Sequence, residues 1–264
     1  MYRAFRLQIN ETIDPKLVQL GKGIFEGDRV KIKDQLDSYL TGEGAIDAEA
    51  VKRDWFHEVK ASVFISHSHT DREKAFYLAG YLKYHFNIRA FVDSAIWEDS
   101  RELQRAIDNN YSWIDQKKEH YSYDAVCAST SHVHMMLATS IAKMIDQSEC
   151  FFFLETKASL TSAGAVKQAT GSPWIYFELE TARSVRIRPK EEHREMVKTA
   201  KTENFSSRHL NVVYPVNFER LSLITNATRE KWLAGQSTSL TRWHPLDQLY
   251  SLIPSEQETR LLNS

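Results

Sequence analysis

Short apolar runs alternate with segments of helical period along most of this chain. The runs are rich in β-branched and aromatic residues and are too short for helices, which predicts buried strands. We expect these strands over residues 61–66, 88–92, 150–154 and 210–216, with a further short strand over residues 2–9. The segments between them repeat apolar positions every three or four residues, which predicts helices. We expect these helices over residues 71–86, 98–107, 129–144, 174–186, 228–233 and 244–253.

Strand alternating with helix over residues 59–256 predicts a three-layer α/β domain of flavodoxin-like type, with a central parallel sheet. Residues 1–58 contain glycine-broken helical segments and too little apolar surface to fold alone. We therefore expect a small, mainly helical N-terminal extension packed against the sheet domain, and a C-terminal tail over residues 257–264. Residues 109–124 predict a long connection, and the stretch 156–171, rich in Ser, Thr, Ala and Gly, predicts a mobile loop.

The composition and net charge argue against some classes of binding partner. The 264 residues include 34 basic and 35 acidic side chains, a net charge of −1, so neither nucleic acid nor an anionic membrane surface is expected as the main partner. The longest apolar run, residues 150–154, is too short to span a bilayer. Two cysteines do not make a disulfide framework, and the N-terminus lacks the apolar core of a signal peptide. The expected location is the cytoplasm.

The first candidate for chemistry lies where the strand over residues 61–66 ends. Residues 67–71 read HSHTD, which fits the H-x-H-x-D opening of the metallo-β-lactamase type of dinuclear metal site. That motif continues with another histidine, whereas Arg72 stands here, and the later histidines lack the ligand spacing. His132 and His134, two apart on a helix, point about 200° apart and cannot chelate one ion together. We expect no metal, and keep a metal-dependent hydrolase as a distant alternative.

The second candidate opens the helix expected over residues 174–186. Trp174 and Glu178 are four residues apart and therefore share one helical face. An indole can stack on a base or a pyridinium, and a carboxylate can bind ribose hydroxyls and stabilise an oxocarbenium-like transition state. The residue pattern alone favours a core tryptophan beside a solvated glutamate.

Three segments in order decide between these interpretations. VFISHSHTD at 63–71, AFVD at 90–93 and SPWIYFELETA at 172–182 resemble the Toll/interleukin-1 receptor (TIR) domain in a bacterial form, over about residues 60–255. The resemblance implies a flavodoxin-like fold and, for many bacterial members, cleavage of the nicotinamide–ribose bond of NAD, several of them in defence against phage. NAD is then the substrate, and no cofactor is expected.

The resemblance also assigns residues. The catalytic glutamate of the W-x-x-x-E block carries over to Glu178, with Trp174 as its aromatic neighbour and Glu180 as an off-register alternative. The substrate-binding residues that it implies are Phe64, Ser66, His67, Asp93, Trp97 and Trp174, with a gating loop after Asp93 that includes Ile96 and Trp97. Sites of this family are often completed between subunits, so self-association is expected, with a companion effector or sensor protein as a further partner.

Several functions remain open from the sequence. The leading hypothesis is an NAD glycohydrolase or ADP-ribosyl cyclase, whose product is ADP-ribose, a cyclic form or a conjugate. One alternative is a non-catalytic TIR scaffold that binds other TIR domains, and another is a nucleotide sensor without turnover. The pairing of Trp174 with Glu178 favours the enzyme over the scaffold.

Overall fold

A five-stranded parallel sheet forms the centre of the protein. The computed structural model describes residues 1–26, 39, 46–56, 59–92, 94–115, 117, 119–163, 166–195, 214–215, 218, 220–238 and 244–254. The strands lie in the order β3 (Ala90–Val92), β2 (Val63–Ser66), β4 (Cys150–Leu154), β1 (Arg3–Leu7) and β8 (Leu221–Ile224). All of them run parallel. The residues of β2, β3 and β4 are fully buried, as continuous apolar runs predict.

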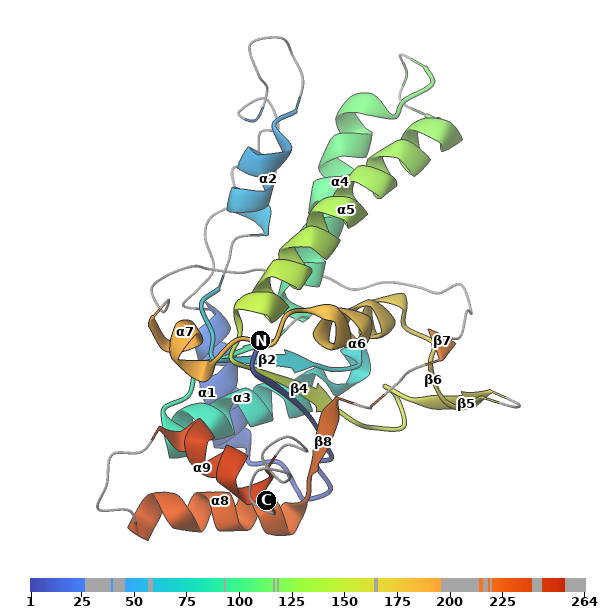
Figure 1. The fold of residues 1–264 in the computed structure, drawn as a ribbon. Coiled ribbons are helices and arrows are strands. Elements are labelled where there is room, and N and C mark those ends of the chain that lie inside the picture. Colours follow the sequence, from blue (N-terminus) through green and yellow to red (C-terminus); the bar gives the residue numbers. More distant parts are fainter. Residues whose placement is uncertain are drawn as a thin grey trace.

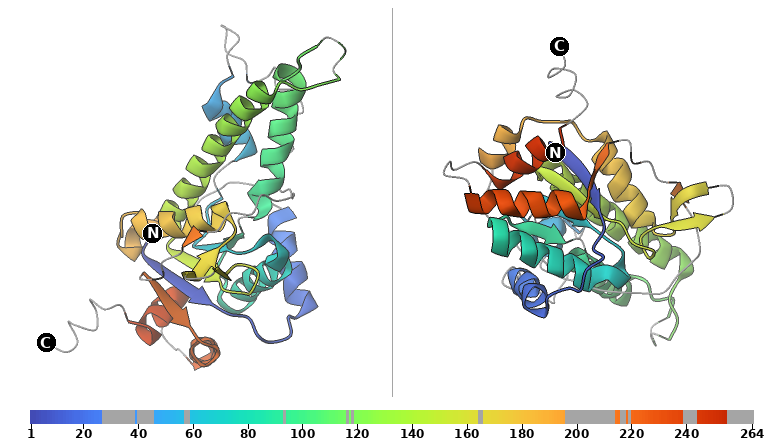
Figure 2. Two further views of the ribbon diagram at one scale, coloured as in Figure 1. Left: turned by 90° about the vertical axis from the view of Figure 1, so that its right-hand side faces the viewer. Right: turned by 90° about the horizontal axis from the view of Figure 1, so that it is seen from below.

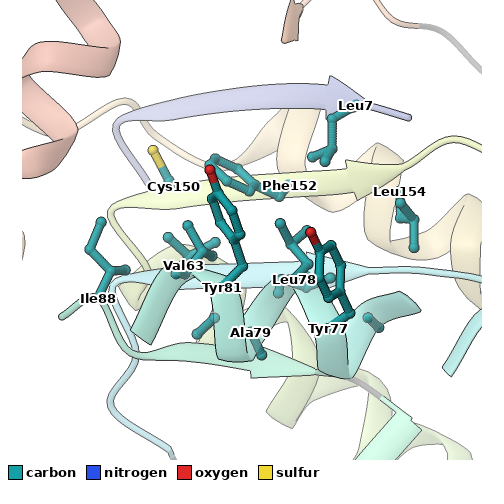
Figure 3. Close-up of a cluster of buried hydrophobic side chains, with 14 of the residues drawn as sticks. Leu7, Val63, Tyr77, Leu78, Ala79, Tyr81, Ile88, Cys150, Phe152 and Leu154 are labelled. Carbon is teal, nitrogen blue, oxygen red and sulfur yellow. The ribbon is translucent and has the colours of Figure 1, made fainter. Parts of the chain in front are cut away.

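Helices cover both faces of the sheet (Figures 1 and 2). One face packs against α1 (Pro15–Glu26), α3 (Arg72–Phe86), α8 (Asn226–Thr238) and α9 (Pro245–Leu252). The other face packs against α2 (Ala48–Trp55), α4 (Ser94–Tyr111), α5 (Tyr123–Gln147) and α6 (Pro173–Ser184). Figure 3 shows the first of these two cores, in which Val63, Phe152 and Leu7 from neighbouring strands meet Tyr77 and Tyr81 of α3. The expectation of an α/β fold with a central parallel sheet is confirmed.

The N-terminal strand β1 lies inside the sheet. It pairs with β4 on one side, Arg3 opposite Cys150, and with β8 on the other, Ala4 opposite Leu221. Phe5 and Leu7 enter the first core, whereas Ala4 enters the second. Residues 3–7 therefore complete the sheet, although the sequence assigns them to an extension beside it.

Helices α1 and α3 approach each other at the backbone. A Cβ atom on Gly80 of α3 would lie 1.9 Å from the carbonyl oxygen of Leu17, and one on Gly21 of α1 would lie 2.0 Å from that of Phe76. Real Cβ atoms do not approach other atoms so closely, so glycine is needed at both positions. Gly23 of α1 has open space around its Cα.

The predicted loop over residues 156–171 is wrong in part. Its second half forms the hairpin β5 (Thr161–Ala163) and β6 (Val166–Thr170), which belongs to a small antiparallel sheet. The third strand of this sheet is β7 (Tyr214–Pro215), which lies within the strand predicted over residues 210–216 but does not join the parallel sheet. The rest of that predicted strand lies outside the described residues. The fifth parallel strand is instead β8, which the sequence analysis missed.

Helices α4 and α5 are longer than predicted and form a hairpin that projects from the sheet together with α2 (Figure 1). The connection between the two helices covers only residues 112–122. It ends at Ser122, which caps α5 by accepting a hydrogen bond from the backbone N–H of Ala125 at 3.3 Å. At the tip of the hairpin, Trp113 stacks on Tyr121 with ring centroids 3.9 Å apart.

Two short helices complete the described structure, the 3₁₀ turn η2 (His69–Asp71) and α7 (Lys190–Glu195). None of the helices in the described part of the chain has a segment long and apolar enough to cross a membrane.

Candidate functional site

The strand order indicates where a ligand site is expected in a sheet of this kind, at its carboxyl edge. The chain leaves β2 toward α3 on one face, and leaves the neighbouring strand β4 toward α6 on the opposite face. Loops that part in this way leave a crevice between them, and ligands of open α/β sheets bind at such a switch point. The candidate site therefore lies between the carboxyl ends of β2 and β4.

Buried polar groups follow β2 at this crevice. Ser66 is opposite Phe153 of β4 and is fully buried, and its hydroxyl makes no hydrogen bond with any residue that the structure describes. His67 follows and is 3% exposed. A buried hydroxyl without a partner costs free energy, which is typical of a site that a ligand completes.

The second set of candidate residues lies on helix α6, which packs on the same face of the sheet as α5. Ser172 caps its N-terminus by accepting a hydrogen bond from the backbone N–H of Ile175 at 3.2 Å, and Pro173 occupies its first turn. The stripe that faces the sheet consists of Ile175, Glu178, Leu179 and Ala182. A carboxylate thus occupies a position in an otherwise apolar stripe.

Glu178 and Glu180 differ sharply in environment. The Glu178 side chain is 0% exposed, whereas Glu180 is partly exposed and forms an ion pair of 3.4 Å with Arg183, three residues along the helix. Exposed pairs of this kind occur on ordinary helix surfaces. Of the two carboxylates, Glu178 alone has the buried environment expected of a functional group.

Trp174, one turn before Glu178, lies in a small group of rings. Its indole packs edge-on against Phe177, with centroids 6.0 Å apart, and against His134 of α5, with centroids 5.6 Å apart and an interplanar angle of 88°. The His134 side chain is exposed, and partial desolvation lowers the pKa of its imidazole. The sequence indicates His134 only as a candidate metal ligand, because nothing local in it shows that α5 packs beside α6.

A hydrogen bond spans the crevice on its α3 side. The Thr156 hydroxyl, just after β4, donates to the Asp71 carboxylate at 2.5 Å, and Lys74 Nζ donates to the same carboxylate at 2.9 Å. Beside them, Glu155 accepts hydrogen bonds from Arg6 and Gln8 at 3.2 and 3.0 Å. Side chains from the ends of β1, β2 and β4 thus meet at one edge.

This geometry gives the metal alternative no support. Asp71, which would supply the carboxylate ligand, binds Lys74 and Thr156, and His69 is exposed while His67 is buried. Within the described residues there is no group of three His, Cys, Asp or Glu side chains placed to hold a metal ion.

The remaining predicted residues have different surroundings. Phe64 lies in the core, where its ring stacks on Phe151 with centroids 5.7 Å apart. Its contribution is therefore to core packing. Asp93 lies outside the described residues, as does the side chain of Trp97. The predicted gating loop after Asp93 is wrong at Ile96 and Trp97, because α4 begins at Ser94.

Comparison with protein families, with curated proteins and with solved structures finds no match for this chain.

Proposed function

We propose that this protein cleaves the nicotinamide–ribose bond of NAD, as a glycohydrolase or cyclase, with Glu178 as the catalytic carboxylate. The observation that carries the proposal is the burial of Glu178 in the apolar stripe of α6, one turn after Trp174. Both residues lie on the helix that follows the strand bordering the switch-point crevice. Ionisable groups in buried positions concentrate at functional sites.

The chemistry suits these residues. Nicotinamide leaves from a cationic pyridinium as a neutral amine, so the reaction needs no general acid. Positive charge then develops at the anomeric carbon of the ribose, where a fixed carboxylate in a water-poor site stabilises it. Attack by water gives ADP-ribose, whereas attack by a group of the substrate itself gives a cyclic product. The indole of Trp174 offers a face for the pyridinium or adenine ring.

The strand order supports a flavodoxin-like fold of the TIR kind. Counted from β2, the order β3-β2-β4-β1-β8 follows the flavodoxin-like order 2-1-3-4-5, except that the fourth place is taken by the N-terminal strand β1. We propose on the sequence resemblance that copies of the chain assemble, and that the protein acts in bacterial defence or signalling.

Access to the site requires an opening of the crevice, since Glu178 is fully buried. The chain between β4 and Glu178 consists of residues 155–172, which include the hairpin β5–β6, and the first turn of α6. We therefore expect the isolated chain at low concentration to turn over slowly, and activity to rise with protein concentration if assembly opens the site.

The test is NAD consumption at high protein concentration, with products identified by mass spectrometry. We expect Glu178→Gln to lower turnover by about 100-fold or more. The matched control is Glu180→Gln, two residues along the same helix, which should keep wild-type turnover. NAD binding without turnover in the wild type would replace the enzyme with the nucleotide sensor, and neither binding nor turnover would replace it with the scaffold.

A further inference from the structure

We propose that His134 of α5 forms part of the substrate site and contacts the nicotinamide end of the dinucleotide beside Trp174. The inference rests on the proposed function and extends it to a residue that neither the sequence motifs nor the family resemblance assigns. Helix α5 packs against α6, and this packing places His134 against the indole of Trp174, one turn before Glu178.

The placement of His134 fits this role. Helix α5 ends where β4 begins, so its C-terminal half covers the sheet while its N-terminal half projects beyond it (Figure 1). His134 lies near the middle of α5, and there it meets Trp174 in the first turn of α6. The imidazole makes no hydrogen bond to another described residue, and the side chain is exposed. Its ring nitrogens are thus available to a ligand that lies against the indole.

The chemistry of the site favours an uncharged imidazole. A neutral ring offers one donor and one acceptor, which match the carbonyl oxygen and the NH₂ group of a carboxamide. It adds no positive charge beside a pyridinium that is itself cationic. Charged groups on the neighbouring helices include Arg101 and Arg105 on α4 and Glu178 on α6. Partial desolvation lowers the pKa of His134, which favours the neutral ring.

Protonation should affect binding more than the chemical step. An imidazolium repels the pyridinium of bound NAD, so KM should rise as the pH falls below about 6.5. This repulsion is relieved as the positive charge moves from the pyridinium to the ribose. We therefore expect kcat to stay level or to rise while KM increases.

The test measures kcat and KM for NAD between pH 5 and 8 in wild type and in His134→Asn. The variant should raise KM about three- to tenfold at pH 7.5, the value of one hydrogen bond, and should abolish the increase of KM in acid. The matched control is His132→Asn, on the same helix and likewise exposed but about 200° away, which should follow the wild type. Thermal unfolding of each variant checks that the fold is retained.

The two proposals fail in different ways. If Glu178→Gln abolishes turnover but His134→Asn matches the wild type in KM at every pH, His134 is not part of the site and the enzyme stands. If His134→Asn lowers kcat without changing KM, the contact with the ground-state pyridinium is wrong. If the wild type does not consume NAD, both proposals fall.

Discussion

The hydroxyl of Thr156 donates a 2.5 Å hydrogen bond to the carboxylate of Asp71, and so joins the two loops that border the crevice. The same hydroxyl oxygen accepts hydrogen bonds from the backbone N–H groups of Ala158 and Ser159 at 3.1 Å, which hold the turn after β4. One side chain thus fixes both the shape of a loop and its distance from the loop opposite. The path from β4 toward α6 begins at this residue.

Removing that hydroxyl should loosen the crevice. We expect Thr156→Val to lower the free energy of unfolding by about 1–3 kcal/mol, because Asp71 is buried and loses a donor while Ala158 and Ser159 lose an acceptor. Thr156→Ser keeps the hydroxyl and should cost less than 1 kcal/mol. Urea denaturation of both variants makes the comparison, and equal losses would show that the threonine methyl group, rather than the hydroxyl, matters.

The crossing of α1 and α3 offers a comparison among glycines in helices. Gly80→Ala should destabilise the protein by about 2 kcal/mol or more, because the added methyl collides with the Leu17 carbonyl and forces the two helices apart. Gly23→Ala adds the same methyl in open space and should stabilise by about 0.5–1 kcal/mol through helix propensity. Thermal unfolding should therefore shift in opposite directions. A stabilising Gly80→Ala would contradict the close approach.

A buried carboxylate at the amino edge of the sheet depends on one arginine. Glu149, 2% exposed, accepts hydrogen bonds from Arg194 at 2.8 and 3.1 Å and from the Tyr250 hydroxyl at 2.8 Å. Arg194→Met leaves this carboxylate without its cation and should cost about 3–5 kcal/mol. Arg183→Met removes the exposed pair with Glu180 and should cost less than about 1 kcal/mol. Similar losses in denaturant melts of the two variants would argue against the buried pair.

Stability should fall in mild acid. Burial lowers the pKa of four imidazoles, those of His85, His134, His193 and His244. Below the ordinary value of about 6.5 the unfolded chain binds protons that the folded chain resists, so this contribution is complete above pH 6.5 and is lost as the pH falls through the folded values.

Urea melts at pH 7.5, 6.5 and 5.5 measure this loss. His244 caps α9 by accepting a hydrogen bond from the backbone N–H of Leu246, and His244→Asn keeps a cap while removing the titration. The variant should lose less stability than the wild type between pH 7.5 and 5.5. A parallel decline of both proteins would assign the acid sensitivity to other groups.

The sequence predicted those parts of the fold that depend on local pattern. The strands at 61–66, 88–92 and 150–154 are continuous apolar runs, and the structure contains β2, β3 and β4 there. The place of β1 could not be predicted, because strand pairing depends on contacts between residues far apart in the chain. Strand β8 was missed because it has only four residues, of which Ser222 is polar and Leu223 is exposed, and so gives a weak signal at the edge of the sheet.

The candidate site likewise has one part that local sequence predicts and another that depends on tertiary packing. The spacing of Trp174 and Glu178 predicts a shared helical face, and local sequence also predicts the capped start of α6. The complete burial of Glu178 and the contact between Trp174 and His134 arise from how α6 packs on the sheet and on α5, a tertiary property that no motif carries. The core position of Phe64 likewise follows from its stack on Phe151.

The central place of β1 has a consequence for synthesis on the ribosome. Its first partner, β4, begins at Cys150, so the strand emerges long before it can pair. At about 5–20 residues per second, the intervening chain takes roughly 10 s or more to appear. During that time a strand made early waits for neighbours made later. We expect the nascent chain to fold late, as a whole, and to depend on chaperones that shield its first strand.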